Sequence, residues 1–134
     1  MKARGARKRL IEYVAKAART PFQWGKHDCA LFAAGAVKAQ TGKDPARGLR
    51  GRYSTVSGAM KHLRKLGYTS LGDLAGAQFQ EIPPAFAQVG DIAVVHDDAA
   101  TEALGVVQGE RIYVLRPDGL GLVPLMSARR AFRV

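Results

Sequence analysis

The chain has 134 residues, of which 47% are hydrophobic and 24% charged, and its net charge at pH 7 is +10. These proportions are typical of a folded protein and exclude a mainly disordered chain, and the length predicts one domain over residues 1–134. The longest apolar stretches are far shorter than the ~20 residues that cross a bilayer, and no apolar signal segment follows the N-terminus. We therefore expect neither a membrane span nor a secretion signal.

The positive charge lies in the N-terminal half of the sequence. Residues 1–67 hold 16 Lys and Arg against three acidic residues, a net charge of +13, whereas residues 68–134 carry −3. Such an asymmetry fits either a solvated basic face or an anionic partner, which would be a polyanion, an acidic protein or an anionic cell-wall polymer. The few aromatic residues do not alternate with the basic ones, which argues against a stacking surface for single-stranded nucleic acid.

Two helices are predicted in the first 42 residues. Apolar side chains recur at helical spacing over residues 6–19, within a basic N-terminal segment (1–19), and predict an amphipathic helix that ends at Thr20-Pro21. A second helix, apolar nearly all round and therefore buried, is expected to begin at Cys29, with Asp28 as its N-cap and Gly42 as its stop signal.

The next segments predict a loop and two further helices. Residues 43–53 are rich in Gly, Pro and Arg and predict a loop. A third helix is expected from residue 54 or 55 to Gly67, with one apolar face, and a short fourth helix within 70–80. Pro83-Pro84 then predicts an extended stretch or a turn.

From Gly90 onward the sequence predicts strands. Short runs rich in Val, Ile and Leu are separated by turn residues, and the connections are tight enough for antiparallel pairing. The predicted strands cover residues 92–96, 104–108, 111–115, 121–126 and 131–134. Helices first and strands second predict an α+β fold, with the N-terminal helices packed on a C-terminal antiparallel sheet.

Cys29 is the strongest candidate for a catalytic residue in this sequence. It opens a helix, and the unpaired N–H groups of a first turn favour a thiolate, which could attack a carbonyl group and use the same N–H groups for the oxyanion. The alternative is a buried cysteine that serves as a small apolar side chain. A single cysteine excludes an internal disulfide and argues against a cysteine-based zinc site, and three histidines without ligand spacing give no metal signal, so no cofactor is expected.

Several motifs together resemble a known family. They are Trp24-Gly25-Lys26-His27-Asp28-Cys29-Ala30-Leu31-Phe32, Gly51-Arg52-Tyr53, Gly90-Asp91-Ile92-Ala93-Val94-Val95 and Ala103-Leu104-Gly105-Val106-Val107. Over about residues 20–134 the chain resembles the small phage-encoded relatives of NlpC-type papain-like cysteine peptidases. The resemblance implies a papain-like fold with Cys29 as the nucleophile. It also implies cleavage of peptide bonds in peptidoglycan and, for the phage members, a place in the tail-tip or tail-assembly module.

The sequence departs from this family at the position of the general base. In the active peptidases the general-base histidine opens the second strand, where this chain has Ala103, and the residue that orients the base falls at Leu115. Loss of the base removes acid-base assistance worth about 10²- to 10⁴-fold. We take as a hypothesis that His96, at the end of the preceding strand and across the ladder from about position 103, replaces it.

The other polar residues have structural interpretations that compete with functional ones. His27 is expected to tune or merely decorate the turn before Cys29, and His62 to face solvent. Arg52 is interpreted as a buried arginine that ties its loop to Asp28 or to a carbonyl group, with substrate binding as the alternative. The adjacent Asp97-Asp98 is expected to be a solvated turn.

These observations lead to three hypotheses of function. The first is a papain-fold tail-tip protein of a phage virion, made in the bacterial host cytoplasm, with weakened or lost peptidase activity. Other tail-tip proteins would be its partners, with peptidoglycan peptides as a further ligand. The second is an active endopeptidase that uses Cys29, with His96 as the candidate base, during genome entry. The third, of another class, is a basic protein associated with nucleic acid, although the composition makes this partner the least favoured.

Overall fold

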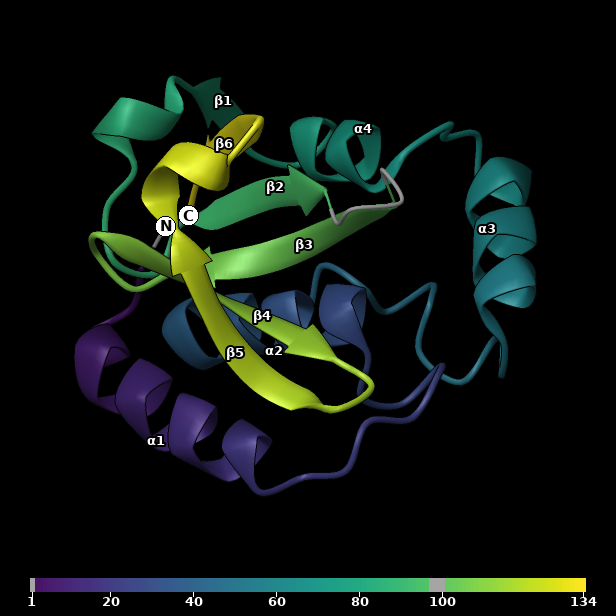
Figure 1. Ribbon diagram of the computed structural model, residues 1–134, viewed down its shortest axis with the longest axis horizontal. Coiled ribbons are helices and arrows are strands. Elements are labelled where there is room, and N and C mark those ends of the chain that lie inside the picture. Colours follow the sequence, from purple (N-terminus) through teal and green to yellow (C-terminus); the bar gives the residue numbers. More distant parts are fainter. Residues whose placement is uncertain (1, 97–100) are drawn as a thin grey trace.

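A computed structural model describes residues 2–96 and 101–134 of the chain. Helices come first and strands follow (Figure 1). The helices are α1 (Ala6–Ala18), α2 (Cys29–Thr41), α3 (Val56–Lys65) and α4 (Leu71–Gly76). The strands are β1 (Gln80–Ile82), β2 (Ile92–His96), β3 (Glu102–Val107), β4 (Arg111–Arg116), β5 (Gly119–Pro124) and β6 (Arg130–Arg133), and two 3₁₀ turns are η1 (Pro84–Phe86) and η2 (Leu125–Ser127). The predicted α+β layout is confirmed.

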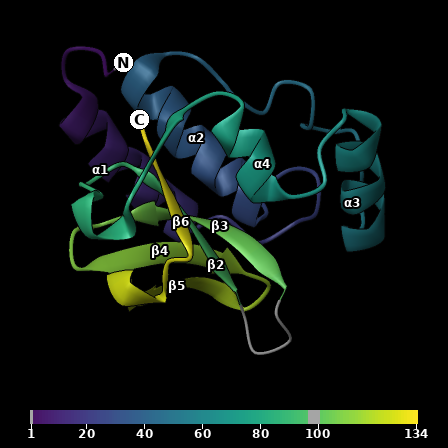
Figure 2. The ribbon, with the colours of Figure 1, turned by 90° about the horizontal axis from the view of Figure 1, so that it is seen from above.

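The strands form one sheet in the order β1-β6-β2-β3-β4-β5, and all neighbours run antiparallel. Strands β2 to β5 are consecutive in sequence, while β6 returns to lie between β1 and β2. Figure 2 shows α1, α2 and α4 on one side of the sheet, with α3 standing apart at the edge of the molecule. Among the described residues, no helix has both the length and the hydropathy that a bilayer crossing requires.

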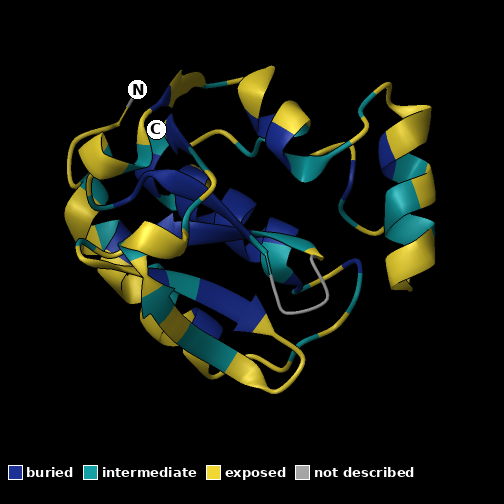
Figure 3. Cartoon of the chain, turned by 45° about the horizontal axis from the view of Figure 1, so that its top comes forward, coloured by how far each residue is buried: buried dark blue, intermediate teal, exposed yellow. Residues whose placement is uncertain are grey.

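Helix α2 is the centre of the core, as its uniformly apolar sequence predicts. It packs against α1 on one side and against β3 and β4 on the other. Phe32 is fully buried in one cluster with Val94, Val106 and Phe132 from the sheet. Figure 3 shows that α2 and the central strands are buried, whereas α1 and α3 expose much of their surface.

The contact between α1 and α2 depends on a glycine. A Cβ atom at Gly35 would overlap the Tyr13 hydroxyl, which donates a hydrogen bond to the carbonyl oxygen of Phe32 at 2.8 Å. The Tyr13 ring stacks on the Phe32 ring with centroids 5.9 Å apart. The missing side chain therefore lets α1 approach α2 closely, although glycine weakens a helix interior by about 1 kcal/mol relative to alanine.

The motif Gly90-Asp91 has a structural role at the start of β2. The buried Asp91 carboxylate accepts hydrogen bonds from the backbone N–H groups of Gln88 (2.8 Å) and Val134 (3.0 Å). Gly90 has a φ of +94°, and its carbonyl oxygen accepts a bond from the buried Gln40 side chain at 3.0 Å. This turn thus links the end of α2, the start of β2 and the C-terminal strand.

The structure differs from the sequence-based elements at the sheet margins. Strand β1 was not predicted, because three residues, two of them polar, are too few to show the alternation of apolar and polar side chains that indicates a strand. It pairs with β6, and the Arg130 guanidinium lies 2.9 Å from the Glu81 carboxylate across this pair. The strand predicted at 121–126 lies two residues earlier, as β5, since residues 125–127 form η2. Asp97-Asp98 lies outside the described residues.

Candidate functional site

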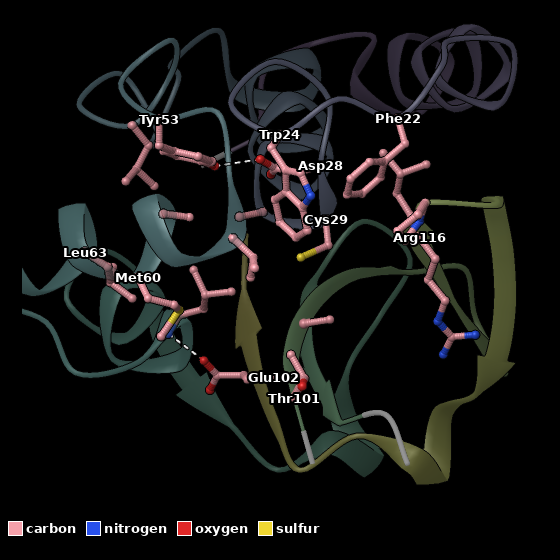
Figure 4. Close-up of a pocket in the computed structure, with 18 of the residues that line it drawn as sticks. Phe22, Trp24, Asp28, Cys29, Tyr53, Met60, Leu63, Thr101, Glu102 and Arg116 are labelled. Atoms are coloured by element: carbon pink, nitrogen blue, oxygen red, sulfur yellow. Dashed lines mark hydrogen bonds between the residues drawn. The ribbon is translucent and has the colours of Figure 1, made fainter. Parts of the chain in front are cut away.

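A buried carboxylate organises the segment around Cys29. Asp28 is 1% exposed and is the N-cap of α2, as predicted, because one of its oxygens accepts the Leu31 N–H at 3.0 Å. The other oxygen accepts the Gly25 N–H at 3.0 Å and the Tyr53 hydroxyl at 2.6 Å (Figure 4). Asp28 therefore fixes the turn before α2, the first turn of α2 and the loop before α3 relative to one another.

The loop residue that reaches Asp28 is Tyr53, not Arg52. Arg52 is exposed, so the expectation that it is buried and tied to Asp28 is wrong. Burial and the bond to the Asp28 carboxylate raise the pKa of Tyr53, which keeps its hydroxyl protonated and donating. The loop arginine with a structural role is Arg50, which pairs with the Asp44 carboxylate at 2.5 Å and donates to the Leu31 carbonyl oxygen at 3.4 Å.

The N-terminus of α2 opens into a cavity of about 320 Å³, which we call the Cys29 cavity. It lies between α3, the turn before α2 and the loop-side ends of β2, β3 and β4. Its walls are mostly apolar and include Phe22, Trp24, Leu49, Val56, Met60, Leu63, Leu71 and Leu115. Figure 4 shows the Cys29 sulfur among them, with Glu102 and Arg116 at the margin.

The polar groups of the Cys29 cavity are largely engaged within the protein. Asp28 has the three partners described above. The Glu102 carboxylate accepts the N–H groups of Leu71 and Gly72 at the start of α4, at 2.6 and 3.3 Å. The apolar face predicted for the third helix is present, and its residues Val56, Met60 and Leu63 form one wall of this cavity. Sequence reasoning missed this wall, although the spacing of its apolar residues was visible.

The environment of Cys29 disfavours the thiolate. The pKa of the thiol is raised to about 11, first by burial and then by the negative charges of Asp28 and Glu102. Hydrogen bonds with the backbone of Leu104 and Ala30 act in the opposite direction and are outweighed. The helix N-terminus favours a thiolate, but desolvation and the charge of the capping residue, which the sequence-based argument did not include, act against it more strongly.

The two positions that the resemblance assigns to the base and its orienting residue converge on the Cys29 cavity. Ala103 and Leu115 both line it, and the backbone of Leu104, next to Ala103, bonds to the sulfur. Neither side chain can accept a proton. At the two positions where the resemblance expects acid-base groups, the wall of the cavity is therefore apolar.

The three histidines lie elsewhere. Val95, not His96, pairs with Ala103, and His96 pairs with Glu102 one residue further along. Val95 lines the Cys29 cavity and His96 does not. The Nδ1 atom of His96 is buried and has no hydrogen-bond partner among residues 2–96 and 101–134. His27 and His62 contact the carbonyl oxygens of Ala17 (3.2 Å) and Gly48 (2.8 Å). The structure therefore does not bring a histidine into the cavity, and the role of His96 stays a hypothesis.

No group of three or more His, Cys, Asp or Glu among residues 2–96 and 101–134 is arranged to hold a metal ion.

Substitution of Gly25 tests how the site is assembled. Gly25 has a φ of +84°, and a Cβ there would overlap the backbone carbonyl oxygen of Tyr53. We expect Gly25→Ala to lower the free energy of unfolding by about 3 kcal/mol or more. Gly51→Ala is the control, because Gly51 has a φ of +72° with open space around it, and should cost only about 1 kcal/mol. Equal losses in urea unfolding of the two variants would contradict the close approach.

The state of the thiol can be measured without any substitution, because Cys29 is the only cysteine of the chain. Alkylation by iodoacetamide requires the thiolate. In the folded protein the rate should rise with pH around a midpoint near 11, whereas in denaturant the midpoint should fall to about 8.5. A folded-state midpoint below that of the denatured chain would show an activated cysteine and refute the account of its environment.

Comparisons with known proteins agree with this architecture. No curated protein matches the sequence. The structure matches one described as "Crystal structure of NlpC/p60 domain of peptidoglycan hydrolase SagA" with a TM-score of 0.62 and 15% identity, over 95% of this chain and 97% of that chain. The match confirms the predicted papain-like fold of NlpC/p60 type. Residues 1–134 also match the family described as "Domain of unknown function (DUF6950)", and the chain therefore belongs to that family.

Proposed function

We propose that this protein is a tail-tip component of a bacteriophage, with a papain-like fold that retains the nucleophile position but has weakened or lost peptidase activity. The observation that supports the loss of activity is that Cys29 shares one apolar cavity with Ala103 and Leu115, neither of which can act as a base. The tail-tip role is supported by the resemblance of the Trp24–Phe32 segment and the later motifs to phage-encoded relatives. On this proposal the protein is made in the host cytoplasm and resides in the virion.

The chemistry of peptide cleavage explains why these substitutions matter. With a thiol pKa of about 11, only about one molecule in ten thousand carries a thiolate at pH 7. A base at hydrogen-bond distance would both remove the thiol proton and later protonate the leaving amine. Ala103 can do neither, so both the attack and the collapse of the intermediate lose assistance.

The Cys29 cavity is nevertheless built to receive a ligand or a neighbouring chain. It is open at a surface formed by α3 and the strand ends, and its aromatic walls, Phe22 and Trp24, pack edge to face with centroids 4.9 Å apart. Such walls favour apolar side chains over charged ones. Other tail-tip proteins and peptidoglycan peptides are the proposed partners, and an apolar side chain of either would enter here.

An active cell-wall endopeptidase is the second candidate. The sulfur lies at the N-terminus of α2 in an accessible cavity, and the domain with the similar fold is named as part of a peptidoglycan hydrolase. This candidate needs a proton acceptor other than the residue at position 103, and His96 is the hypothesis for that role.

Incubation with purified muropeptides distinguishes the two candidates. The wild-type protein, Cys29→Ala and His96→Ala are compared by chromatography of the peptide products and by release of free amines. We expect no cleavage above the level of Cys29→Ala, because the thiol lacks a base. Cleavage that depends on Cys29 would overturn the loss of activity, and its further dependence on His96 would assign the base.

The location of the protein tests the tail-tip role. Purified particles from the strain that encodes the chain are probed with an antibody against it and viewed by electron microscopy. Label at the tail end remote from the capsid is expected. Particles that carry no label while the protein accumulates in the cell would contradict the proposal.

A further inference from the structure

A second hollow of the surface, which we call the basic groove, lies between α1, α2 and the loop that joins them. Its volume is about 870 Å³, and it shares no lining residue with the Cys29 cavity. The basic side chains that line it are Arg9, Lys16, Lys26, Lys38 and Arg50, and no Asp or Glu is among its lining residues. In Figures 1 and 2, α1 runs alongside α2. Both helices contribute lining residues to the groove.

The positive charge of the basic groove is only partly compensated by the protein. The Arg9 guanidinium donates to the carbonyl oxygens of Ala39 and Arg4, both at 2.6 Å, and Arg50 pairs with Asp44. The side chains of Lys16, Lys26 and Lys38 are exposed, and within the described part of the chain their ammonium groups make no ion pair or hydrogen bond, although the charge of Lys38 also acts on the Asp44 carboxylate. Three exposed ammonium groups around one hollow create a potential that attracts anions.

The other residues that line the basic groove indicate which kind of anion it can bind. Tyr13 and His27 are the aromatic rings among the lining residues, and both are half-buried and pack against Phe32, so the groove lacks the series of exposed rings on which successive bases stack. The lining also includes Pro21 and Gln23, which present an apolar ring and an amide group. This mixture of charged, apolar and amide surface suits a polypeptide that carries carboxylates together with other side chains, whereas a phosphate polymer would leave the apolar part unused.

We propose that the basic groove binds an acidic polypeptide segment of a partner protein, with its carboxylates at Lys16, Lys26 and Lys38. This site lies outside the Cys29 cavity, so it goes beyond the proposed function and does not depend on Cys29. Because the contacts join exposed charges, binding weakens as salt rises.

The test uses the full chain and a fluorescein-labelled peptide of alternating Glu and Leu, with fluorescence anisotropy at low and at physiological salt. The test variant combines Lys16→Glu, Lys26→Glu and Lys38→Glu. The matched control combines Lys61→Glu, Arg64→Glu and Lys65→Glu, which makes the same change in net charge on the exposed side of α3. We expect the groove variant to bind about tenfold more weakly than wild type or worse, and the α3 variant to bind within about twofold of wild type.

Each other outcome decides against the proposal. If both triple variants weaken peptide binding equally, the peptide is attracted to the basic protein in general and not to the groove. If a peptide with Gln in place of Glu binds as tightly as the Glu peptide, the charge of the peptide does not determine binding. A single-stranded DNA oligonucleotide that binds more tightly than the peptide, and loses affinity only in the groove variant, would assign the groove to nucleic acid instead. Cys29→Ala should leave peptide binding unchanged, so failure here is separable from failure of the proposed function. Thermal unfolding confirms that both triple variants are folded.

Discussion

The structure depends on one buried carboxylate. Asp28 accepts hydrogen bonds from three segments, through the backbone of Gly25 and Leu31 and the hydroxyl of Tyr53. Bonds to a charged acceptor are each worth about 1.5–3 kcal/mol, and here they compensate for its desolvation without a cation. The same interaction that positions Cys29 at the start of α2 also keeps a negative charge beside the thiol. One residue therefore both builds the site and opposes ionisation of its sulfur.

The papain-like fold of this chain places Cys29 in a cavity whose wall is apolar at the two positions that the resemblance assigns to acid-base groups. Cys29, Ala103 and Leu115 occupy converging positions on α2, β3 and β4, and the space between them is apolar. Dry surroundings would strengthen the attraction between a thiolate and a neighbouring imidazolium, but they penalise a thiolate with no partner. We therefore propose that the Cys29 cavity binds a side chain rather than cleaves a bond, while the basic groove is a chemically different surface that shares no lining residue with it.

Local signals in the sequence were sufficient for the elements around Cys29 and insufficient for long-range geometry. The Asp28 cap, the Gly42 stop and the helix between them follow from short-range hydrogen-bonding rules, and all are confirmed. The pairing of Val95 rather than His96 with Ala103 depends on the register of the sheet, where a shift by one residue reverses the face. The Tyr53 contact joins residues 25 positions apart, and the pKa of Cys29 depends on burial, which no local pattern reports.

Restoring a base at position 103 tests the central claim most directly. An Ala103→His variant, with Leu122→His on the exposed part of β5 as its control, would be examined by the pH dependence of the Cys29 thiolate absorbance, after circular dichroism has confirmed the fold. The account predicts that the variant forms thiolate at a pH well below 11, because an imidazolium beside the sulfur stabilises it, while the control titrates like wild type. A folded Ala103→His variant whose thiol titrates as in wild type would contradict the assignment of position 103 as the place of the missing general base.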